Sequence, residues 1–332
     1  MRTATSGVAL PRAAAPAVAF SACATELQRP VLQKGAALVT ALLIVTFVSV
    51  IASSMLWGAN LDRRRAEVML FTDQGFEYAL GAEAWAGDIL RDDLEKSQID
   101  FPGEPWATAL PPLPIDGGYI EGLVEDMQGR FNINNIVDAN GVVNQPALEQ
   151  FERLLTSLDI EPRLATVVAD WLDGDVEVGF PDGAEDDAYT ELTPPYRAAN
   201  ALLTNASELL AIVGFDRASY ERLKPYVTAL PPGTPLNVNT TTVPVLQAVA
   251  AGLGTAEADT LLEEAHQLGL QDLSGLEGSV PQDALSELSV TSGWFRVTTR
   301  VSIGTTMFTM YSLLERDAQG TIWTRFRSFG TE

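Results

Sequence analysis

The sequence predicts an α+β protein that one helix anchors in a membrane. Three observations lead to this prediction: a long uncharged apolar run near the N-terminus, several strand-like segments at the C-terminus, and short helical segments between them. With 332 residues, the chain is long enough for two folding units beyond the anchor.

The apolar run at residues 36–57 contains neither a charged residue nor a proline. As a helix it would be about 33 Å long, which is enough to cross a hydrocarbon core of about 30 Å. We therefore predict a transmembrane helix at residues 36–58. A buried helix of a soluble core is the alternative. Basic residues flank the run on both sides, so charge alone leaves its orientation open.

Two other targeting signals compete with this anchor. A secretory signal peptide would place small residues at a cleavage site after the apolar run, and Ser53-Ser54 is a poor candidate. Residues 17–23 loosely resemble a lipoprotein cleavage site with Cys23 as the acylated residue, although Arg12 and Pro16 interrupt the preceding stretch. Cys23 is the only cysteine in the chain, so a disulfide framework is excluded.

The anchor helix is expected to continue to about Glu95, because apolar or small residues recur there with an average spacing of 3.6. This stripe consists of Phe76, Ala79, Ala82, Ala86, Leu90 and Leu94. Five prolines between residues 102 and 114 then predict a loop. Residues 119–126 alternate in polarity and predict a strand.

Three further strands are predicted at residues 294–303, 306–315 and 322–328, which are rich in β-branched and aromatic residues. Short turns at Gly304 and at residues 317–320 separate them. Together with the strand near residue 120, they predict one antiparallel sheet packed against the anchor helix. This domain is split in sequence into residues 59–131 and 289–332.

Residues 132–288 are predicted to form an inserted α-helical domain. Residues 158–172, 213–227 and 251–265 each read as a tight turn followed by a helix and look like internal repeats. Asn132 and Asn237 begin two similar Asn-x-Asn segments, which is consistent with side chains that cap helix starts. Helix-hairpin-helix modules that bind DNA are one alternative. The segments are acidic, whereas a phosphate-binding face requires the opposite charge.

Composition narrows the function classes. The formal net charge of −23 argues against nucleic acid as a partner and favours cations or basic proteins. The chain has no nucleophile-elbow, phosphate-loop or histidine metal motif, and its single histidine is His266. We therefore predict that it is not an enzyme, with a hydrolase based on two carboxylates as a remaining alternative. A cell-surface adhesin is another alternative.

The densest charge lies in an acidic loop at residues 170–187. Asp173, Asp175 and Glu177 alternate as in the first half of an EF-hand loop, but Val178 replaces the expected glycine and Glu185 comes one residue late. Seven carboxylates between Asp173 and Asp187 repel one another unless they are solvated or neutralised. Only oxygen ligands are available, which selects Ca²⁺ over zinc. A solvated acidic loop without metal is the alternative.

Lys34-Gly35 directly before an apolar helix resembles the prepilin-peptidase site of type IV pilins and type II secretion pseudopilins. Five stretches in order resemble K-type minor pseudopilins, whose pilin domain is interrupted by a large α-domain. They are QGRFNINN (128–135), ADWLDGD (169–175), GAEDDAY (183–189), ASELLAIVGFDRASYERLKPYV (206–227) and LNVNTTTVPVL (236–246). The resemblance implies that residues 1–35 are a prepilin leader, with cleavage between Gly35 and Ala36 and methylation.

One position departs from most members of the wider family. The fifth mature residue, usually a glutamate, is Thr40 here. A carboxylate in a bilayer is costly, and in these families it offsets the N-terminal ammonium of a neighbouring subunit. A subunit with none above it has no use for that charge, so Thr40 marks a tip position. Neutral drift at a lipid-facing position is the alternative.

The resemblance also implies partners, location and a cofactor. The expected partners are the I and J minor pseudopilins, with the H subunit as a further candidate, the prepilin peptidase and the inner-membrane assembly platform. The expected location is the bacterial inner membrane, with a cytoplasmic N-terminus and a periplasmic body. The expected function is to cap the pseudopilus, help initiate its assembly and limit its length. The acidic loop is expected to bind one or two calcium ions through Asp173, Asp175, Glu185 and Asp186.

Overall fold

The computed structural model describes residues 34–276, 278 and 280–330. The predicted leader and Cys23 therefore lie outside the described residues. The chain divides into two compact units, Met1–Arg63 and Arg64–Glu332. We describe each unit by itself.

Helix α1 (Lys34–Lys96) is continuous through the predicted anchor and beyond it. Up to residue 63 nearly all of its described side chains are exposed, and between residues 36 and 57 none of them is charged. Among the described residues it is the one helix long and apolar enough to cross a membrane. The part of the helix in the first unit, from Lys34 to Arg63, would be about 45 Å long at 1.5 Å per residue, which is enough to cross a hydrocarbon core of about 30 Å.

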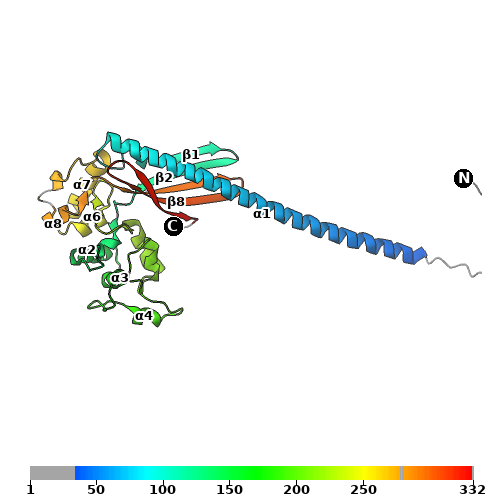
Figure 1. Ribbon diagram of the computed structural model, residues 1–332, viewed down its shortest axis with the longest axis horizontal. Helices are drawn as coiled ribbons and strands as arrows, with labels where there is room; N and C mark the ends of the chain where they lie inside the picture. The colour runs from blue at the N-terminus through cyan, green and yellow to red at the C-terminus, as the bar shows by residue number, and fades with distance from the viewer. Residues whose placement is uncertain (1–33, 277, 279, 331–332) are drawn as a thin grey trace, which may run out of the picture. The chain divides into compact units, whose positions relative to one another are not determined.

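The second half of α1 packs on a sheet in the second unit (Figure 1). Ala79, Ala86 and Leu90 of the predicted stripe are buried, as expected. Small residues bring helix and sheet close together: a Cβ added at Gly75 would lie 2.8 Å from the Cβ of Phe308. The helix ends at Lys96, within one residue of the predicted end.

The sheet has five antiparallel strands in the order β1-β2-β7-β8-β9. Their bounds are β1 Leu110–Ile115, β2 Gly118–Asp126, β7 Trp294–Ile303, β8 Thr306–Arg316 and β9 Ile322–Phe329. Strand β2 pairs with β7 from Gly118 opposite Ile303 to Asp126 opposite Phe295. The domain is therefore split in sequence, and the four predicted strands agree with the structure to within one residue at each end.

Strand β1 corrects one prediction. The prolines at 111, 112 and 114 indicated a loop, yet these residues lie in a strand at the edge of the sheet. Proline has no N–H to donate, so it is tolerated where one side of a strand has no partner. A register shift between Leu110 and Leu113 accommodates the prolines.

The insert is mainly helical and has its own large core around Phe151, Leu155, Leu172 and Tyr189. Its α-helices are α2 Gln145–Ser157, α3 Leu164–Leu172, α4 Asp186–Thr190, α5 Arg217–Leu223, α6 Val243–Val249, α7 Thr255–Leu268 and α8 Gln282–Leu285. Each of the three predicted turn-helix segments contains a helix: α3, α5 and α7. The described residues also contain five short 3₁₀ helices, of which the first precedes the insert: η1 Pro105–Ala107, η2 Ile133–Ile136, η3 Ala206–Ala211, η4 Lys224–Tyr226 and η5 Ser274–Leu276.

The insert also contains two short parallel strand pairs that the sequence did not indicate. They are β3 (Phe131–Asn132) with β4 (Val227–Thr228), and β5 (Leu236–Asn237) with β6 (Leu288–Ser289). Each pair contains one of the two predicted capping asparagines. The side-chain oxygen of Asn132 accepts from the Asn134 N–H at 3.3 Å, and that of Asn237 accepts from the Asn239 N–H at 3.0 Å. The repeated sequence motif therefore corresponds to a repeated local structure.

Candidate metal centre

The acidic loop begins at helix α3, all nine residues of which are buried. Asp170 is only 2% exposed. The Gly179 N–H donates to both of its carboxylate oxygens, at 3.2 Å to Oδ1 and 3.0 Å to Oδ2. A Cβ at Gly179 would lie 2.4 Å from one Asp170 oxygen, and a Cβ at Gly183 would lie 2.1 Å from the other. The loop therefore folds back over Asp170, and only glycine fits at these two positions.

This fold brings three of the four predicted ligands together. Asp173 caps the C-terminal end of α3, Asp175 lies two residues later, and Glu185 precedes α4. One carboxylate oxygen from each lies within 4.8 Å of the other two. Among the described residues, Asp173 Oδ1 and both Glu185 oxygens are buried without a hydrogen-bond partner.

The electrostatics of this three-carboxylate group are unfavourable without a cation. The pKa of Asp173 is raised to about 6, mainly by burial and additionally by the neighbouring Asp175 and Asp170 carboxylates. Burial likewise raises the pKa of Glu185 to about 7, again assisted by Asp170 and Asp173. The group therefore combines buried oxygens that lack hydrogen-bond donors with carboxylates that repel one another. Both features are expected of a site for a hard divalent cation with oxygen ligands.

Asp186, the fourth predicted ligand, lies outside this group. It is the first residue of α4, and its Oδ1 accepts the Ala198 N–H at 3.1 Å. Its Oδ2 lies 3.5 Å from a guanidinium nitrogen of Arg197. These contacts fasten residues 197–198 to the start of α4.

Asn200 is a candidate ligand that sequence reasoning missed. Its Nδ2 donates to the carbonyl oxygen of Asp175 at 2.5 Å, while its Oδ1 is buried without a partner among the described residues. Its backbone has a positive φ of 43°, a conformation that asparagine tolerates better than most residues. No pattern in the sequence links it to the acidic loop 25 residues earlier.

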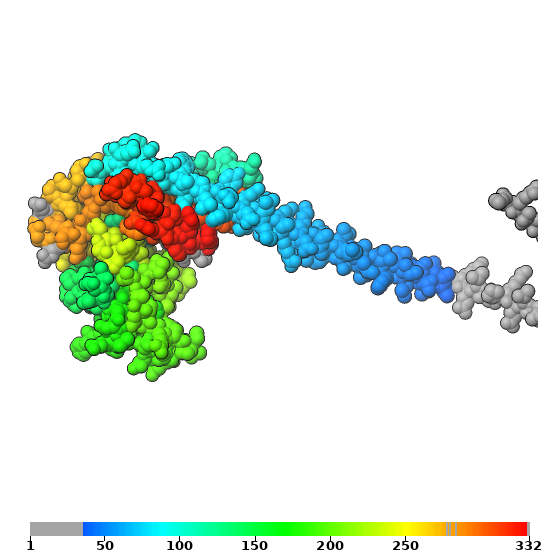
Figure 2. All heavy atoms as spheres, viewed as in Figure 1, coloured from blue at the N-terminus to red at the C-terminus, as the bar shows by residue number. Residues whose placement is uncertain are grey.

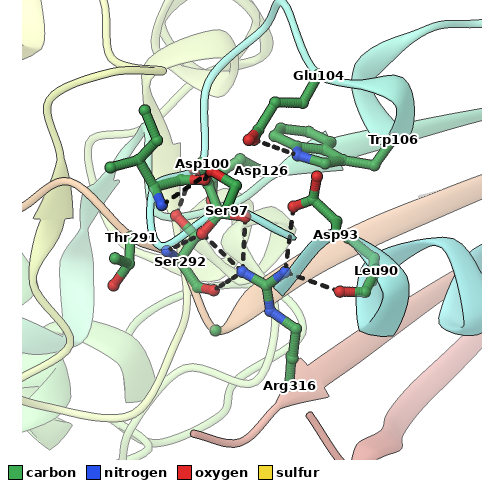
Figure 3. Close-up of polar contacts among 12 residues, drawn as sticks. Leu90, Asp93, Ser97, Asp100, Glu104, Trp106, Asp126, Thr291, Ser292 and Arg316 are labelled. Atoms are coloured by element: carbon green, nitrogen blue, oxygen red, sulfur yellow. Dashed lines mark hydrogen bonds and ion pairs between the residues drawn. The ribbon is translucent and has the colours of Figure 1, made fainter. Parts of the chain in front are cut away.

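A second group of buried carboxylates, Asp93, Asp100 and Glu104, lies where α1 meets the sheet and the insert (Figure 3). Here the positive charge is supplied by Arg316 at the end of β8. One terminal nitrogen of Arg316 lies 2.6 Å from both Asp100 oxygens, and the other lies 3.5 Å from Asp93. Glu104 accepts from the indole N–H of Trp106 at 2.9 Å. The arginine thus supplies this group with one positive charge from the protein itself.

The neighbouring Asp126 extends the network into the insert. Its Oδ2 accepts from Ser292 at 2.6 Å, from Thr240 at 2.5 Å and from the Asn237 side chain at 2.9 Å. Asn237 also donates to the carbonyl oxygen of Asp100 at 3.0 Å. These bonds join the end of β2, the loop before β7 and strand β5 of the insert. We name Asp93, Asp100, Glu104, Asp126 and Arg316 the junction network.

The residues predicted from the prepilin resemblance lie at the start of α1. Gly35 and Ala36 belong to the first turn of the helix. The exposed Thr40 donates its hydroxyl to the carbonyl oxygen of Ala37 at 3.0 Å. Its polar group is therefore satisfied within its own helix.

Comparison with known proteins identifies the family. The profile of the family described as Type II secretion system (T2SS), protein K matches residues 129–232. Type II secretion system protein K of Pseudomonas aeruginosa is 34% identical over 313 residues, which cover 90% of this chain and 93% of the relative. The protein of the same name from Pectobacterium carotovorum is 35% identical, covering 86% of this chain and 94% of the relative. The chain belongs to the type II secretion system protein K family.

A solved structure supports the same assignment. A chain from the crystal structure of the GspK-GspI-GspJ complex of the enterotoxigenic Escherichia coli type 2 secretion system matches with a TM-score of 0.71. The sequences are 26% identical, and the match covers 81% of this chain and all of the other. The predicted family and the predicted α+β fold of a protein K are thus confirmed.

Proposed function

We propose that this protein K acts as a minor pseudopilin at the tip of the periplasmic pseudopilus, where it helps initiate assembly and limits length. The observation that carries the tip position is Thr40, an uncharged residue whose hydroxyl bonds within its own helix. A subunit inside the shaft would need a carboxylate here for its neighbour, whereas a terminal subunit does not. Family membership favours this function over an adhesin or a DNA-binding protein.

The proposed partners are the I and J minor pseudopilins, with the H subunit, the prepilin peptidase and the inner-membrane assembly platform as further candidates. The E. coli relative was solved in a complex with two other Gsp proteins, I and J. The long helix α1 supports a single-pass anchor in the bacterial inner membrane. We propose cleavage between Gly35 and Ala36, methylation, and a periplasmic body. That the chain has no enzymatic activity remains a prediction.

Calcium is the proposed cofactor of the acidic loop. Asp173, Asp175 and Glu185 would hold the ion, with Asn200 as a further oxygen ligand. Bound Ca²⁺ would neutralise these carboxylates and hold α3, the loop and α4 together. Because the described body contains no cysteine, the ion would replace a disulfide as a local cross-link.

Co-purification tests the main proposal. The full chain, extracted in detergent from cells that express the remaining secretion genes, should recover the I and J subunits. Deletion of the chain's gene should abolish secretion, and the plasmid-borne chain should restore it. Normal secretion in the deletion strain would refute the proposed function.

A further inference from the structure

The two edges of the five-stranded sheet differ in a way that the fold itself does not require. One edge is β1, which has three prolines among six residues and a register shift. The other edge is β9, which has no proline and no glycine among its eight residues. Prolines and irregular backbone keep other strands from adding to an edge. The chain therefore blocks one edge and leaves the other open.

The hydrogen bonds at the two ends of β9 determine which of its backbone groups face outward. Gly330 N–H donates to the Thr309 carbonyl, and Asp317 N–H donates to the Thr321 carbonyl. Paired backbone groups alternate along an antiparallel strand, and β9 shifts register by one residue near its middle. Four residues consequently turn their N–H and C=O groups away from β8: Ile322, Thr324, Arg327 and Phe329. Among the described strands, β9 pairs with β8 alone, so no strand pairs with these outward groups.

The side chains of these four residues face α1 and hold β9 in place. Arg327 forms a two-pronged ion pair with Glu83 of α1, at 2.8 Å for both bonds, and Thr324 donates to Glu83 at 2.8 Å. The ring of Phe329 packs edge-on against Phe76 at a centroid distance of 5.8 Å. The open edge is therefore a fixed template rather than a frayed end.

Apolar side chains flank this edge on the surface. Trp323, Phe326 and Phe329 are 53%, 40% and 53% exposed, respectively. Figure 2 shows the last strand, in red, at the surface of the second unit, with no other described segment in front of it in this view. An added strand would cover these rings and pair the outward backbone groups.

We propose that β9 binds an extended strand from a neighbouring minor pseudopilin, an I or a J subunit, which continues the sheet beyond β9. This inference rests on the proposed function, since that function supplies the partner. An added strand would lie beside α1, because Glu83 and Phe76 of that helix contact β9. The same subunit could then contact the helix and the sheet edge of this chain.

A matched pair of substitutions tests the proposal. Thr324→Ala and Thr324→Pro both lose the bond to Glu83, but only the proline removes the outward N–H. That N–H has no bond to β8, so the ladder of the sheet remains complete in both variants. In detergent extracts, the full-length Thr324→Pro chain should recover at least about tenfold less of the partner than the Thr324→Ala chain, with matching melting temperatures.

Hydrogen exchange on the unaltered chain provides a second test that does not depend on folding of a variant. The amides of Thr324, Arg327 and Phe329 should exchange more slowly when purified I and J subunits are added. Equal recovery by the two Thr324 variants, or unchanged exchange in the recovered complex, would overturn the strand-addition proposal alone. Failure of the unaltered chain to bind either subunit would overturn the proposed function as well. If the same amides exchange more slowly when the chain self-associates in the absence of I and J, the edge binds a second copy of this chain, and the proposed partner is wrong.

Discussion

The guanidinium of Arg316 approaches both carboxylate oxygens of Asp100 at 2.6 Å, and the two side chains are only 2% and 1% exposed. The same guanidinium donates to the carbonyl oxygens of Leu90 and Ser292 at 2.9 and 2.8 Å. One side chain at the end of β8 thus bonds to the last turns of α1 and to the loop that enters β7. This pair stands at the centre of the junction network.

Removal of Arg316 should strongly destabilise the second unit. Arg316→Met leaves Asp100 and Asp93 buried without their cation, and breaking a buried pair from one side costs about 3–5 kcal/mol. Urea denaturation of residues 64–332 measures the change in the free energy of unfolding. Arg163→Met is the control, because its ion pair with Glu161 is exposed on both sides and should change stability by less than about 1 kcal/mol. A similar small effect for Arg316→Met would contradict the assigned role.

The junction network should also make stability depend on pH. Burial raises the pKa of Asp93 from its ordinary value of 3.8 to about 7, with Glu104 and Asp100 adding to the shift and Arg316 opposing it. The folded state then binds more protons than the unfolded state, so this stabilisation is complete below about pH 4. It is lost as the pH rises through 7.

Denaturation at pH 5 and pH 8 in saturating calcium checks this prediction. The free energy of unfolding should be larger at pH 5, and Asp93→Asn should reduce the difference by at least about 1 kcal/mol. Asp88→Asn, an exposed acid on the same helix, serves as the control. A pH profile that Asp93→Asn leaves unchanged would show that the carboxyl does not titrate in this range.

Calcium should stabilise the chain through the acidic loop. An ion that binds only the folded state adds about 2.7 kcal/mol at a hundredfold excess over Kd. The protein should therefore melt several degrees lower in EGTA, and calcium rather than magnesium should restore the transition. Asp173→Asn with Glu185→Gln should melt independently of calcium. Asp182→Asn changes an exposed carboxylate of the same loop and should leave the calcium-dependent rise in melting temperature intact. Identical melting curves with and without EGTA would refute the proposed calcium site.

A negative charge at residue 40 should impair the function of the chain as the terminal subunit of the pseudopilus. Thr40→Glu places a carboxylate that a terminal subunit cannot pair, so we expect impaired secretion or altered pseudopilus length, with normal membrane insertion. Thr40→Val, which removes the hydroxyl without adding charge, should secrete normally. Secretion and length assays in a complemented deletion strain compare the two. A fully functional Thr40→Glu chain with unchanged length would remove the physical argument for a tip subunit.

Processing should begin the mature chain at Ala36. Intact-mass measurement or N-terminal sequencing of the membrane-extracted protein reports the first residue directly. Gly35→Val should leave the leader attached, whereas Ala37→Val, two positions later, should be processed. A mature chain that starts at Cys23 with a lipid adduct would instead establish the lipoprotein alternative.

The sequence predicted elements well where one local rule determined the structure. The stripe on α1 and the β-branched segments of β7, β8 and β9 follow periodicities of 3.6 and 2, and both survive in the fold. Strand β1 was missed because proline content argues against a strand, while the position at a sheet edge, which permits it, is a property of the whole fold.

Side chains fixed by distant partners were harder to predict. Glu83 lies among the apolar residues of the α1 stripe, yet it is buried because Arg327, Ser312 and Thr324 reach it from strands more than 200 residues later. Asp186 carries the same charge as Asp173 and lies in the same loop. Only the turn into α4 directs it towards Arg197 rather than into the three-carboxylate group.

The split sheet has a consequence for the order of folding. Asp126 pairs with Phe295, so β2 and β7 meet across the whole insert. Closing an unfolded loop of that length costs roughly 4–5 kcal/mol in chain entropy, before a constant term. The insert has its own core, and the short β5–β6 pair joins the C-terminal end of the insert at Leu288 to Leu236 in its interior. A prefolded insert would hold its two ends at a fixed separation, so the last three strands could add to β2 as a local event rather than a long-range search.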